Sequence, residues 1–168
     1  FMYWRYFLWN FCGRQNDIQG YDPYDNLHGN WITGIPFLDA MRAPQENMPK
    51  ELADNQGRNA MYGLPFLLGL LGFAYQYRKD RRDALVVLTL FFFTGLAVVL
   101  YLNQAPYQPR ERDYSYVGSF YAFSIWIGLG VMGLFEFISK RMKAGNEKPA
   151  IAIAVIASLI VPVVMEIG

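Results

Sequence analysis

The chain is short of metal-ligating and disulfide-forming residues, with one cysteine, Cys12, and one histidine, His28, in 168 residues. A single cysteine excludes an intrachain disulfide, and one cysteine with one histidine cannot build an ordinary zinc site. We expect Cys12 to be a small buried apolar residue. Asp22, Asp25 and His28 follow no recognised ligand spacing, so we expect a solvated loop there. The sequence predicts no metal site and no resident cofactor.

Charge of one sign is also scarce. The formal net charge is +1 at pH 7, and no block of like charge is large enough to neutralise many phosphates along a duplex. Nucleic acid is therefore excluded as a partner. The chain opens without a methionine or a basic stretch ahead of an apolar one, so no signal peptide is visible. Because it opens inside an aromatic run, residues 1–7, we expect a piece of a longer polypeptide.

Apolar residues, by contrast, are abundant, at 54% of the chain, and aromatic residues reach 17%. Four segments are dominated by Leu, Val, Ile, Phe, Ala and Gly: residues 60–77, 84–102, 116–138 and 150–167. Each is about 18 to 23 residues long, enough to cross a ~30 Å hydrocarbon core as a helix. They lack the alternation of barrel strands. The predicted fold class is an all-α integral membrane protein with about four transmembrane helices.

Basic residues near helix ends predict the orientation of these spans, because Lys and Arg are retained on the cytoplasmic side. The loop of residues 78–83 holds four basic residues, and residues 139–148 hold Lys140, Arg141, Lys143 and Lys148. Between them, residues 103–115 hold Arg110 and Arg112 alone. We therefore expect the first and third loops to be cytoplasmic and residues 1–59 and 103–115 to be extracytoplasmic.

The chain is expected to divide into an N-terminal region, residues 1–59, and a transmembrane region, residues 60–168. Residues 1–12 are apolar almost all round, and Gly13 is expected to end their helix. This aromatic helix either completes a span whose start is missing, which we favour, or is interfacial with Trp4 and Trp9 at headgroup depth.

The remainder of the N-terminal region, residues 15–59, is polar and rich in Asn, Asp, Gly and Pro. This composition is typical of an ordered extramembrane loop with short turns. Residues 29–38 are more apolar but too short to span, which favours an interfacial or re-entrant stretch. We expect the loop to pack over the outer ends of the spans, with Trp31 and Phe37 covered.

The first of two polar clusters lies in residues 103–115. Two prolines there cannot continue a helix. In an extended chain Arg110 and Arg112 project to one face, and Glu111 and Asp113 to the other. Two guanidinium groups on one face suit a phosphate or diphosphate. The alternative is a self-neutralising surface loop whose charges pair with one another at the interface.

The second cluster follows the aromatic helix and consists of Arg14, Gln15, Asn16 and Asp17. Neighbouring amides and charges suit sugar hydroxyls, which need donors and acceptors in fixed pairs. The same residues equally suit helix capping and turns, so both readings stay open.

Several residues inside the predicted spans have a structural interpretation. Glu136 precedes Lys140 by one helical turn, which favours an interfacial ion pair, whereas Glu166 is a candidate intramembrane acid. Glycines within spans usually permit close helix packing. This interpretation covers Gly69, Gly72, Gly128, Gly130 and Gly133.

The clusters belong to longer strings that resemble a known family. The strings are residues 2–19, 29–32, 118–123 and above all 101–114, which hold Arg110, Glu111, Arg112, Asp113 and Tyr114. They resemble a bacterial multi-spanning family catalogued as a domain of unknown function and placed near the protein O-mannosyltransferases. Its members look like GT-C glycosyltransferases, which move a sugar from a polyprenyl-phosphate carrier to a protein on the extracytoplasmic side.

The resemblance implies a multi-pass protein of the bacterial inner membrane that transfers sugar, with inversion, to a Ser or Thr hydroxyl. Its partners would be membrane lipid, the lipid-linked donor, an acceptor protein and other membrane subunits. Arg110 and Arg112 would lie at the lipid-phosphate end of the donor. The family's catalytic acid lies on an earlier loop, so no catalytic residue is assigned. Alternatives are a noncatalytic scaffold subunit and, last, a transporter of lipid-linked sugar, since the spans offer few buried polar residues.

Overall fold

A computed structural model describes most of the chain. The described residues are 2–20, 24–41, 45, 48–103, 112–141, 151–153, 155–156, 159–160 and 162–163. Arg110, Glu111, Asp22 and Glu166, which the sequence singled out, lie outside them. The described part is mostly helical, as predicted. The described residues of the fourth predicted span, 150–167, are all helical.

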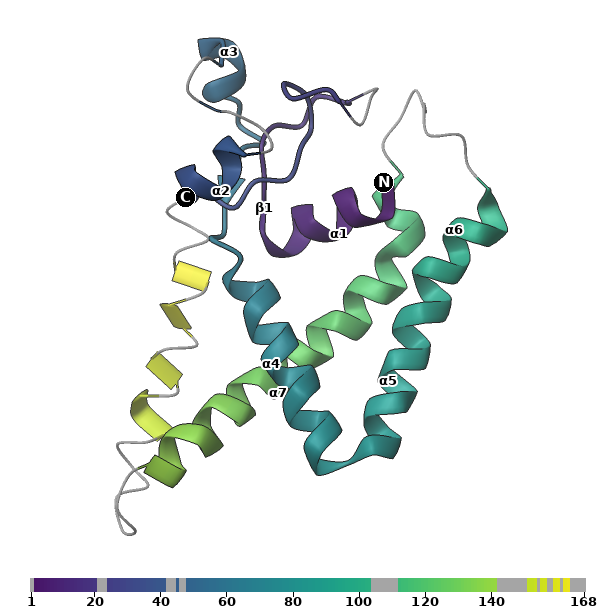
Figure 1. Ribbon diagram of the computed structural model, residues 1–168, viewed down its shortest axis with the longest axis vertical. Helices are drawn as coiled ribbons and strands as arrows, with labels where there is room; N and C mark the ends of the chain where they lie inside the picture. Colours follow the sequence, from purple (N-terminus) through teal and green to yellow (C-terminus); the bar gives the residue numbers. More distant parts are fainter. Residues whose placement is uncertain are drawn as a thin grey trace.

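Helices α4 to α7 build the body of the molecule (Figure 1). α4 runs down to a tight turn, α5 returns, and α6 continues it after a break at Gly95. A 3-10 turn, η1, then leads into α7, which crosses α4 diagonally. Their bounds are α4 (Leu64–Lys79), α5 (Arg81–Thr94), α6 (Leu96–Leu102), η1 (Asp113–Tyr116) and α7 (Val117–Arg141).

Two of these stretches are long and apolar enough to cross a membrane: Arg81–Leu102 and Asp113–Lys140. They extend the predicted spans of residues 84–102 and 116–138. The extension of α5 has a local cause, because the Asp80 carboxylate accepts hydrogen bonds from the amides of Arg82 and Asp83 and caps the helix.

The first predicted span, residues 60–77, is wrong at its start. Residues 59–60 form strand β2 (Asn59–Ala60), and α4 begins only at Leu64. Between them Tyr62 and Gly63 both take left-handed backbone angles, with φ of 53° and 65°, which no helix continues through. α4 is therefore 16 residues long, about 24 Å.

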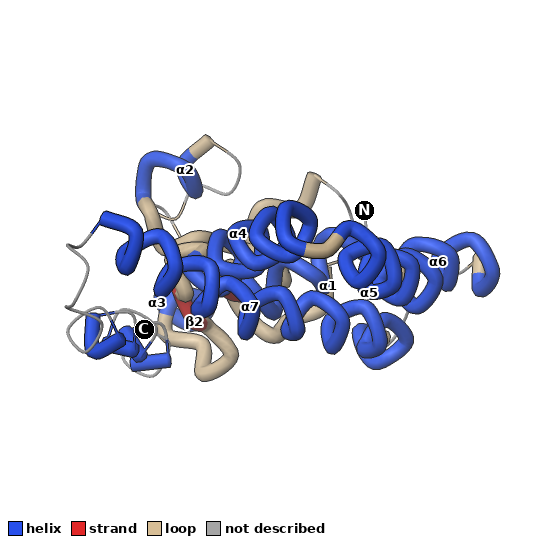
Figure 2. Tube along the Cα trace, turned by 90° about the horizontal axis from the view of Figure 1, so that it is seen from below, coloured by secondary structure: helices blue, strands red, loops and turns tan. Residues whose placement is uncertain are grey.

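α4 and α7 make the most extensive helix contact in the described chain, and Figure 2 shows them stacked. Glycines bring the two backbones together at the crossing. A Cβ on Gly72 would collide with the Trp126 carbonyl oxygen, and one on Gly130 with the Leu68 carbonyl oxygen. Gly69 faces the Phe123 ring in the same way. The predicted packing role is thus confirmed for these three.

The remaining two glycines, Gly133 and Gly128, differ in how closely other residues approach them. Gly133 faces Leu71 and Tyr75 across the α4 and α7 interface, at 3.0 and 3.1 Å from the position a Cβ would take. Nothing lies within 4 Å of that position at Gly128, so its predicted packing role is wrong within the described residues.

The aromatic helix α1 (Met2–Phe11) lies across the upper ends of α4 and α7 and forms the centre of the core (Figure 1). Tyr3, Tyr6 and Phe7 are at most 3% exposed. The Phe7 ring meets the Phe123 ring edge to face, with centroids 4.8 Å apart. The described helix has ten residues, about 15 Å, so it does not span a bilayer by itself.

The two tryptophans of α1, which were predicted to lie at headgroup depth, differ in their exposure. Trp4 is half exposed, consistent with that placement, but Trp9 is 5% exposed and its indole N–H donates to the Gly29 carbonyl oxygen at 3.1 Å. Trp9 is therefore held by protein. The sequence pattern of α1 did not distinguish a lipid-facing surface from a protein-facing one.

A short antiparallel pair follows α1, in which β1 (Gly13–Arg14) pairs with β2. Arg14 also bridges to Trp31 on the other side. The helix ends before Gly13 as predicted, but Gly13 itself sits in the strand with φ +140°. A Cβ there would come within 2.9 Å of the Ile32 and Asn59 carbonyl oxygens.

The two remaining helices, α2 (Pro36–Ala40) and α3 (Lys50–Ala53), belong to the polar loop region. Asp39 is buried and accepts hydrogen bonds from the Thr33 amide at 2.8 Å and the Gly34 amide at 2.8 Å. This network fixes the turn before α2. Trp31 packs against the aromatic core as expected, but Phe37 is 75% exposed, which corrects its predicted coverage.

Candidate functional site

The end of the molecule that carries α1 holds the second polar cluster and the described residues of the first, from Arg112 onward. α4 begins there, α6 ends there and α7 begins there, whereas the basic turn between α4 and α5 lies at the opposite end (Figure 1). The candidate site is therefore built around α1.

Within the second cluster, Gln15 is fully buried. Its side-chain oxygen accepts from the Asn30 side-chain amide at 2.9 Å and from the Asn30 backbone amide at 3.2 Å. Its side-chain nitrogen donates to the Asn26 carbonyl oxygen at 2.9 Å. Gln15 thereby ties β1 to the loop of residues 24–30.

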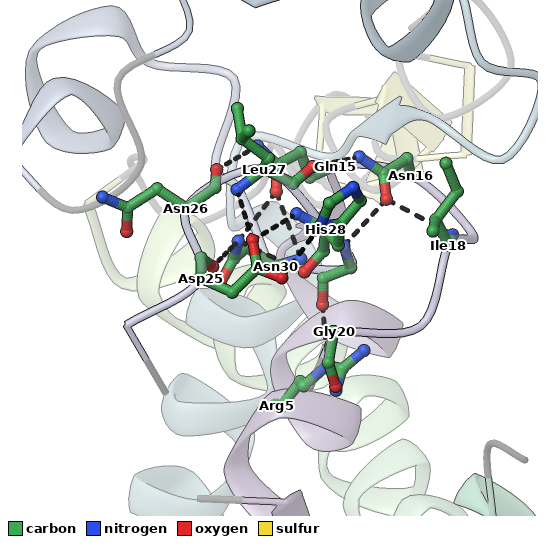
Figure 3. A network of polar contacts seen from close by, with 11 residues as sticks. Arg5, Gln15, Asn16, Ile18, Gly20, Asp25, Asn26, Leu27, His28 and Asn30 are labelled. Carbon is green, nitrogen blue, oxygen red and sulfur yellow. Dashed lines mark hydrogen bonds and ion pairs between the residues drawn. The ribbon is translucent and has the colours of Figure 1, made fainter. Parts of the chain in front are cut away.

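Asn16 is also fully buried and binds the same loop (Figure 3). Its side-chain nitrogen donates to the Leu27 carbonyl oxygen at 2.8 Å, and its oxygen accepts from the Gly29 amide at 2.7 Å. With no exposed surface, neither amide contacts a ligand in this arrangement. A sugar could reach Gln15 or Asn16 only after residues 24–30 had moved away.

The two charged members of that cluster lie closer to the surface. Arg14 is half-buried, its guanidinium stacks 4.1 Å from the Trp9 ring centroid, and its Nε donates to the Asn16 carbonyl oxygen at 3.0 Å. Asp17 is exposed and accepts from the Asn55 side chain at 2.8 Å. These two side chains are the members of the cluster that a ligand can reach directly.

Arg5 anchors the same loop from beneath. Its Nε donates to the Gly29 carbonyl oxygen at 2.7 Å and one terminal nitrogen to the Gly20 carbonyl oxygen at 3.2 Å. Its guanidinium also lies 4.7 Å from the Trp9 ring centroid, so both Arg5 and Arg14 contact that ring. This role was not predicted from the sequence. A lone arginine in an apolar helix could have indicated it, because a buried cation needs hydrogen-bond acceptors.

Asp25 and His28 form a turn. The Asp25 carboxylate accepts from the Leu27 amide at 2.9 Å and the His28 amide at 3.1 Å, and it lies 2.8 Å from the His28 Nδ1. Among the described residues no group of three His, Cys, Asp or Glu side chains gathers as a metal site would require. The geometry is that of a turn held by hydrogen bonds between its own residues.

This turn predicts a pH response. Burial works to raise the pKa of Asp25, but the amide and imidazole hydrogen bonds outweigh it and hold that pKa below its ordinary value. Asp25 therefore contributes stability above its unfolded pKa of about 3.9, and this contribution is lost as pH falls through the folded value.

We expect the hydrogen-exchange protection factors of the Leu27 and His28 amides to decrease when the pH is lowered below about 4. Asp25→Asn should show low protection at neutral pH already and little further change. Asp54→Asn, at an exposed position, is the matched control and should behave as the parent. Equal pH profiles for the parent and Asp25→Asn would contradict this role.

The described part of the first cluster touches α1. The Arg112 amide donates to the Tyr6 hydroxyl at 3.5 Å, and the Asp113 carboxylate accepts from the Tyr114 amide at 3.0 Å. Asp113 and Tyr114 are exposed. The Tyr6 ring lies 5.3 Å from the Trp9 ring, which in turn stacks on Arg14. One helix thus links Arg112 with Arg14.

An apolar cavity of about 200 Å³ opens beside the same helix, between α1, α4, α5 and α7. Trp4 and Phe7 of α1 line one side of it. The other lining residues come from the long helices and include Phe66, Phe91, Phe123 and Trp126. Its wall has no polar surface, so it suits a hydrocarbon chain rather than a sugar.

Comparisons with protein-family models, with curated proteins and with solved structures found no match to this chain.

Proposed function

We propose that the chain is part of a multi-pass protein of the bacterial inner membrane that crosses the bilayer about four times. The support is the surface of α5 and α6, where Val86, Phe93 and Leu100 are 68%, 62% and 79% exposed. In an 18-residue window of the Arg81–Leu102 stretch the mean hydropathy is 2.6, and 6% of the window is buried by protein. A helix that is apolar all round and uncovered needs lipid around it.

The topology follows from the charges. In this proposal the basic turns of residues 78–83 and 139–148 face the cytoplasm, and residues 1–59 and 103–115 face outward. Cysteine labelling in intact cells tests this without removing Cys12, because Cys12 is 4% exposed and burial raises the pKa of its thiol to about 11.

We expect a membrane-impermeant maleimide to label Gln108→Cys but not Arg82→Cys in intact cells, and to label both after lysis. The parent chain, with Cys12 alone, should stay unlabelled until it is denatured. Labelling of Arg82→Cys but not Gln108→Cys would invert the topology and move the candidate site to the cytoplasm.

For the function, we propose a GT-C-like glycosyltransferase that moves a sugar from a polyprenyl-phosphate donor to a protein hydroxyl. One observation carries it: α1 joins the Arg112 segment, through Tyr6, to a wholly apolar cavity, through Trp4 and Phe7. A lipid phosphate needs cations for its head and an apolar channel for its chain.

In this proposal Arg110 and Arg112 stabilise the charge that develops on the departing lipid phosphate. Asp113 and Tyr114 follow Arg112 in η1 and are exposed, so in this proposal they contact the donor from the same side. In the same proposal Arg14 and Asp17 contact the sugar or the acceptor. No residue of this chain is assigned as the base that activates the hydroxyl.

The test is sugar transfer by the full-length protein carrying Arg110→Lys or Arg112→Lys. Lysine keeps the charge but loses the bidentate geometry, so we expect activity to fall at least tenfold with expression unchanged. Arg82→Lys, at the opposite end, is the control and should retain activity. Near-normal transfer by both outer variants would reject the donor-phosphate role.

A noncatalytic scaffold subunit is the second candidate, and the buried amides of Gln15 and Asn16 favour it. Their hydrogen bonds build a rigid loop rather than an open ligand site. A scaffold predicts that transfer survives both arginine substitutions, while Asn16 substitutions release partner subunits from the purified assembly.

A further inference from the structure

α4 and α7 diverge beyond their glycine crossing, at the other end of the molecule (Figure 1). The residues there line a second cavity. It is an open groove of about 770 Å³ between the last turns of the two helices. Its floor is apolar and includes Leu71, Ala74 and Phe137. No part of the function proposed above uses it.

The rim of the groove is cationic. Arg78, Lys79 and Lys140 line it together with one acid, Glu136, so its net charge is three minus one, or +2. Lys140 pairs with Glu136 at 2.7 Å, the ion pair predicted from the sequence.

Neither of the other two cations forms an ion pair with a residue in the described part of the chain, although Glu136 also attracts Lys79 electrostatically. Lys79 donates to the Tyr75 hydroxyl, a neutral acceptor, at 3.0 Å. Arg78 has no hydrogen bond or ion pair with any residue in the described part of the chain. An anion is therefore the complement that this rim lacks.

We propose that this groove binds an anionic phospholipid, with its phosphate between Arg78 and Lys79 and its acyl chains along Leu71, Ala74 and Phe137. A guanidinium and an ammonium that line the same groove suit a phosphodiester. Basic pockets between transmembrane helices on the cytoplasmic side are suited to anionic headgroups. The apolar floor directly below the cations distinguishes a lipid from a free phosphate.

The proposal rests on the membrane setting proposed above but not on sugar transfer. Binding is measured on the full chain purified in a neutral detergent, by native mass spectrometry and by the thermal midpoint. The probes are phosphatidylglycerol, phosphatidylcholine and inorganic phosphate. Detergent samples do not depend on topology, so a reversed labelling pattern and a failed lipid assay are separate results.

We expect phosphatidylglycerol to bind and raise the midpoint, and phosphatidylcholine and inorganic phosphate to do neither at matched concentrations. The double variant Arg78→Gln with Lys79→Gln should weaken phosphatidylglycerol binding at least tenfold. Arg81→Gln with Arg82→Gln is the control, since it removes the same charge from the same turn but outside the groove.

Three results would overturn the proposal. Equal binding of both phospholipids would show that charge does not select the occupant. Equal losses in the two double variants would show diffuse attraction to the basic turn. Binding of inorganic phosphate as strong as that of phosphatidylglycerol would show an anion site without a lipid.

Discussion

Gly72→Ala and Gly130→Ala are each expected to destabilise the protein by about 3 kcal/mol, at the upper end of overpacking penalties. The reason is that the added methyl meets backbone. At Gly72 it meets the Trp126 carbonyl, and at Gly130 the Leu68 carbonyl. Neither obstacle can rotate away as a side chain would, so α4 and α7 must separate. The measurement is the thermal midpoint in detergent.

Gly128→Ala is the matched control on the same helix as Gly130. No atom lies within 4 Å of the position its Cβ would take. Alanine also has the higher helix propensity, by about 1 kcal/mol, so this variant should be neutral or slightly stabilised. Equal losses at Gly128 and Gly130 would show that the effect is not contact at the crossing.

The glycine series also shows how far the sequence could be interpreted. Long apolar segments predicted helices correctly, because composition and length are local properties. The identity of the facing residue is not local. Gly128 and Gly130 look alike in sequence, and their difference depends on the rotation of α7 against α4. The prediction therefore failed for Gly128 alone.

The same limit explains α1. Its aromatic residues predicted an apolar environment correctly, but they could not say whether lipid or protein supplied it. Trp9 faces protein because its indole N–H donates to the Gly29 carbonyl oxygen, 20 positions away in the chain. The start of α4 was missed for a different reason, since Tyr62 adopts a left-handed conformation that its residue type does not favour.

At the candidate site, the sequence located both polar clusters but not the use of each side chain. Four neighbouring polar residues, Arg14 to Asp17, gave no sign of which would be buried. Strand alternation did not separate them either, because Gln15 and Asn16 are both buried. Their partners are mostly backbone groups of residues 26–30, which carry no sequence signature.

Asn16→Ala is expected to cost about 3 kcal/mol of stability, because it leaves one buried partner and two part-buried partners without hydrogen bonds. The Gly29 and Ile18 amides would lose their acceptor, and the Leu27 carbonyl oxygen its donor. Each unsatisfied buried group costs about 1–3 kcal/mol. We therefore expect residues 24–30 to detach from β1, which limited proteolysis in detergent would detect as a new cleavage in this loop.

Asn26→Ala distinguishes this network from a general sensitivity of the loop. Asn26 is the same residue type in the same loop, but it is exposed and accepts a hydrogen bond from Gln15 through its backbone carbonyl oxygen. Its side chain points away from the network (Figure 3). Its replacement should change stability by no more than about 0.5 kcal/mol. If Asn16→Ala and Asn26→Ala were cleaved at the same rate as the parent chain, the buried amides would not be what holds the loop in place. If both were cleaved faster to the same degree, the loop would depend on side chains at its surface, and Gln15 and Asn16 would again be open to a role in binding sugar.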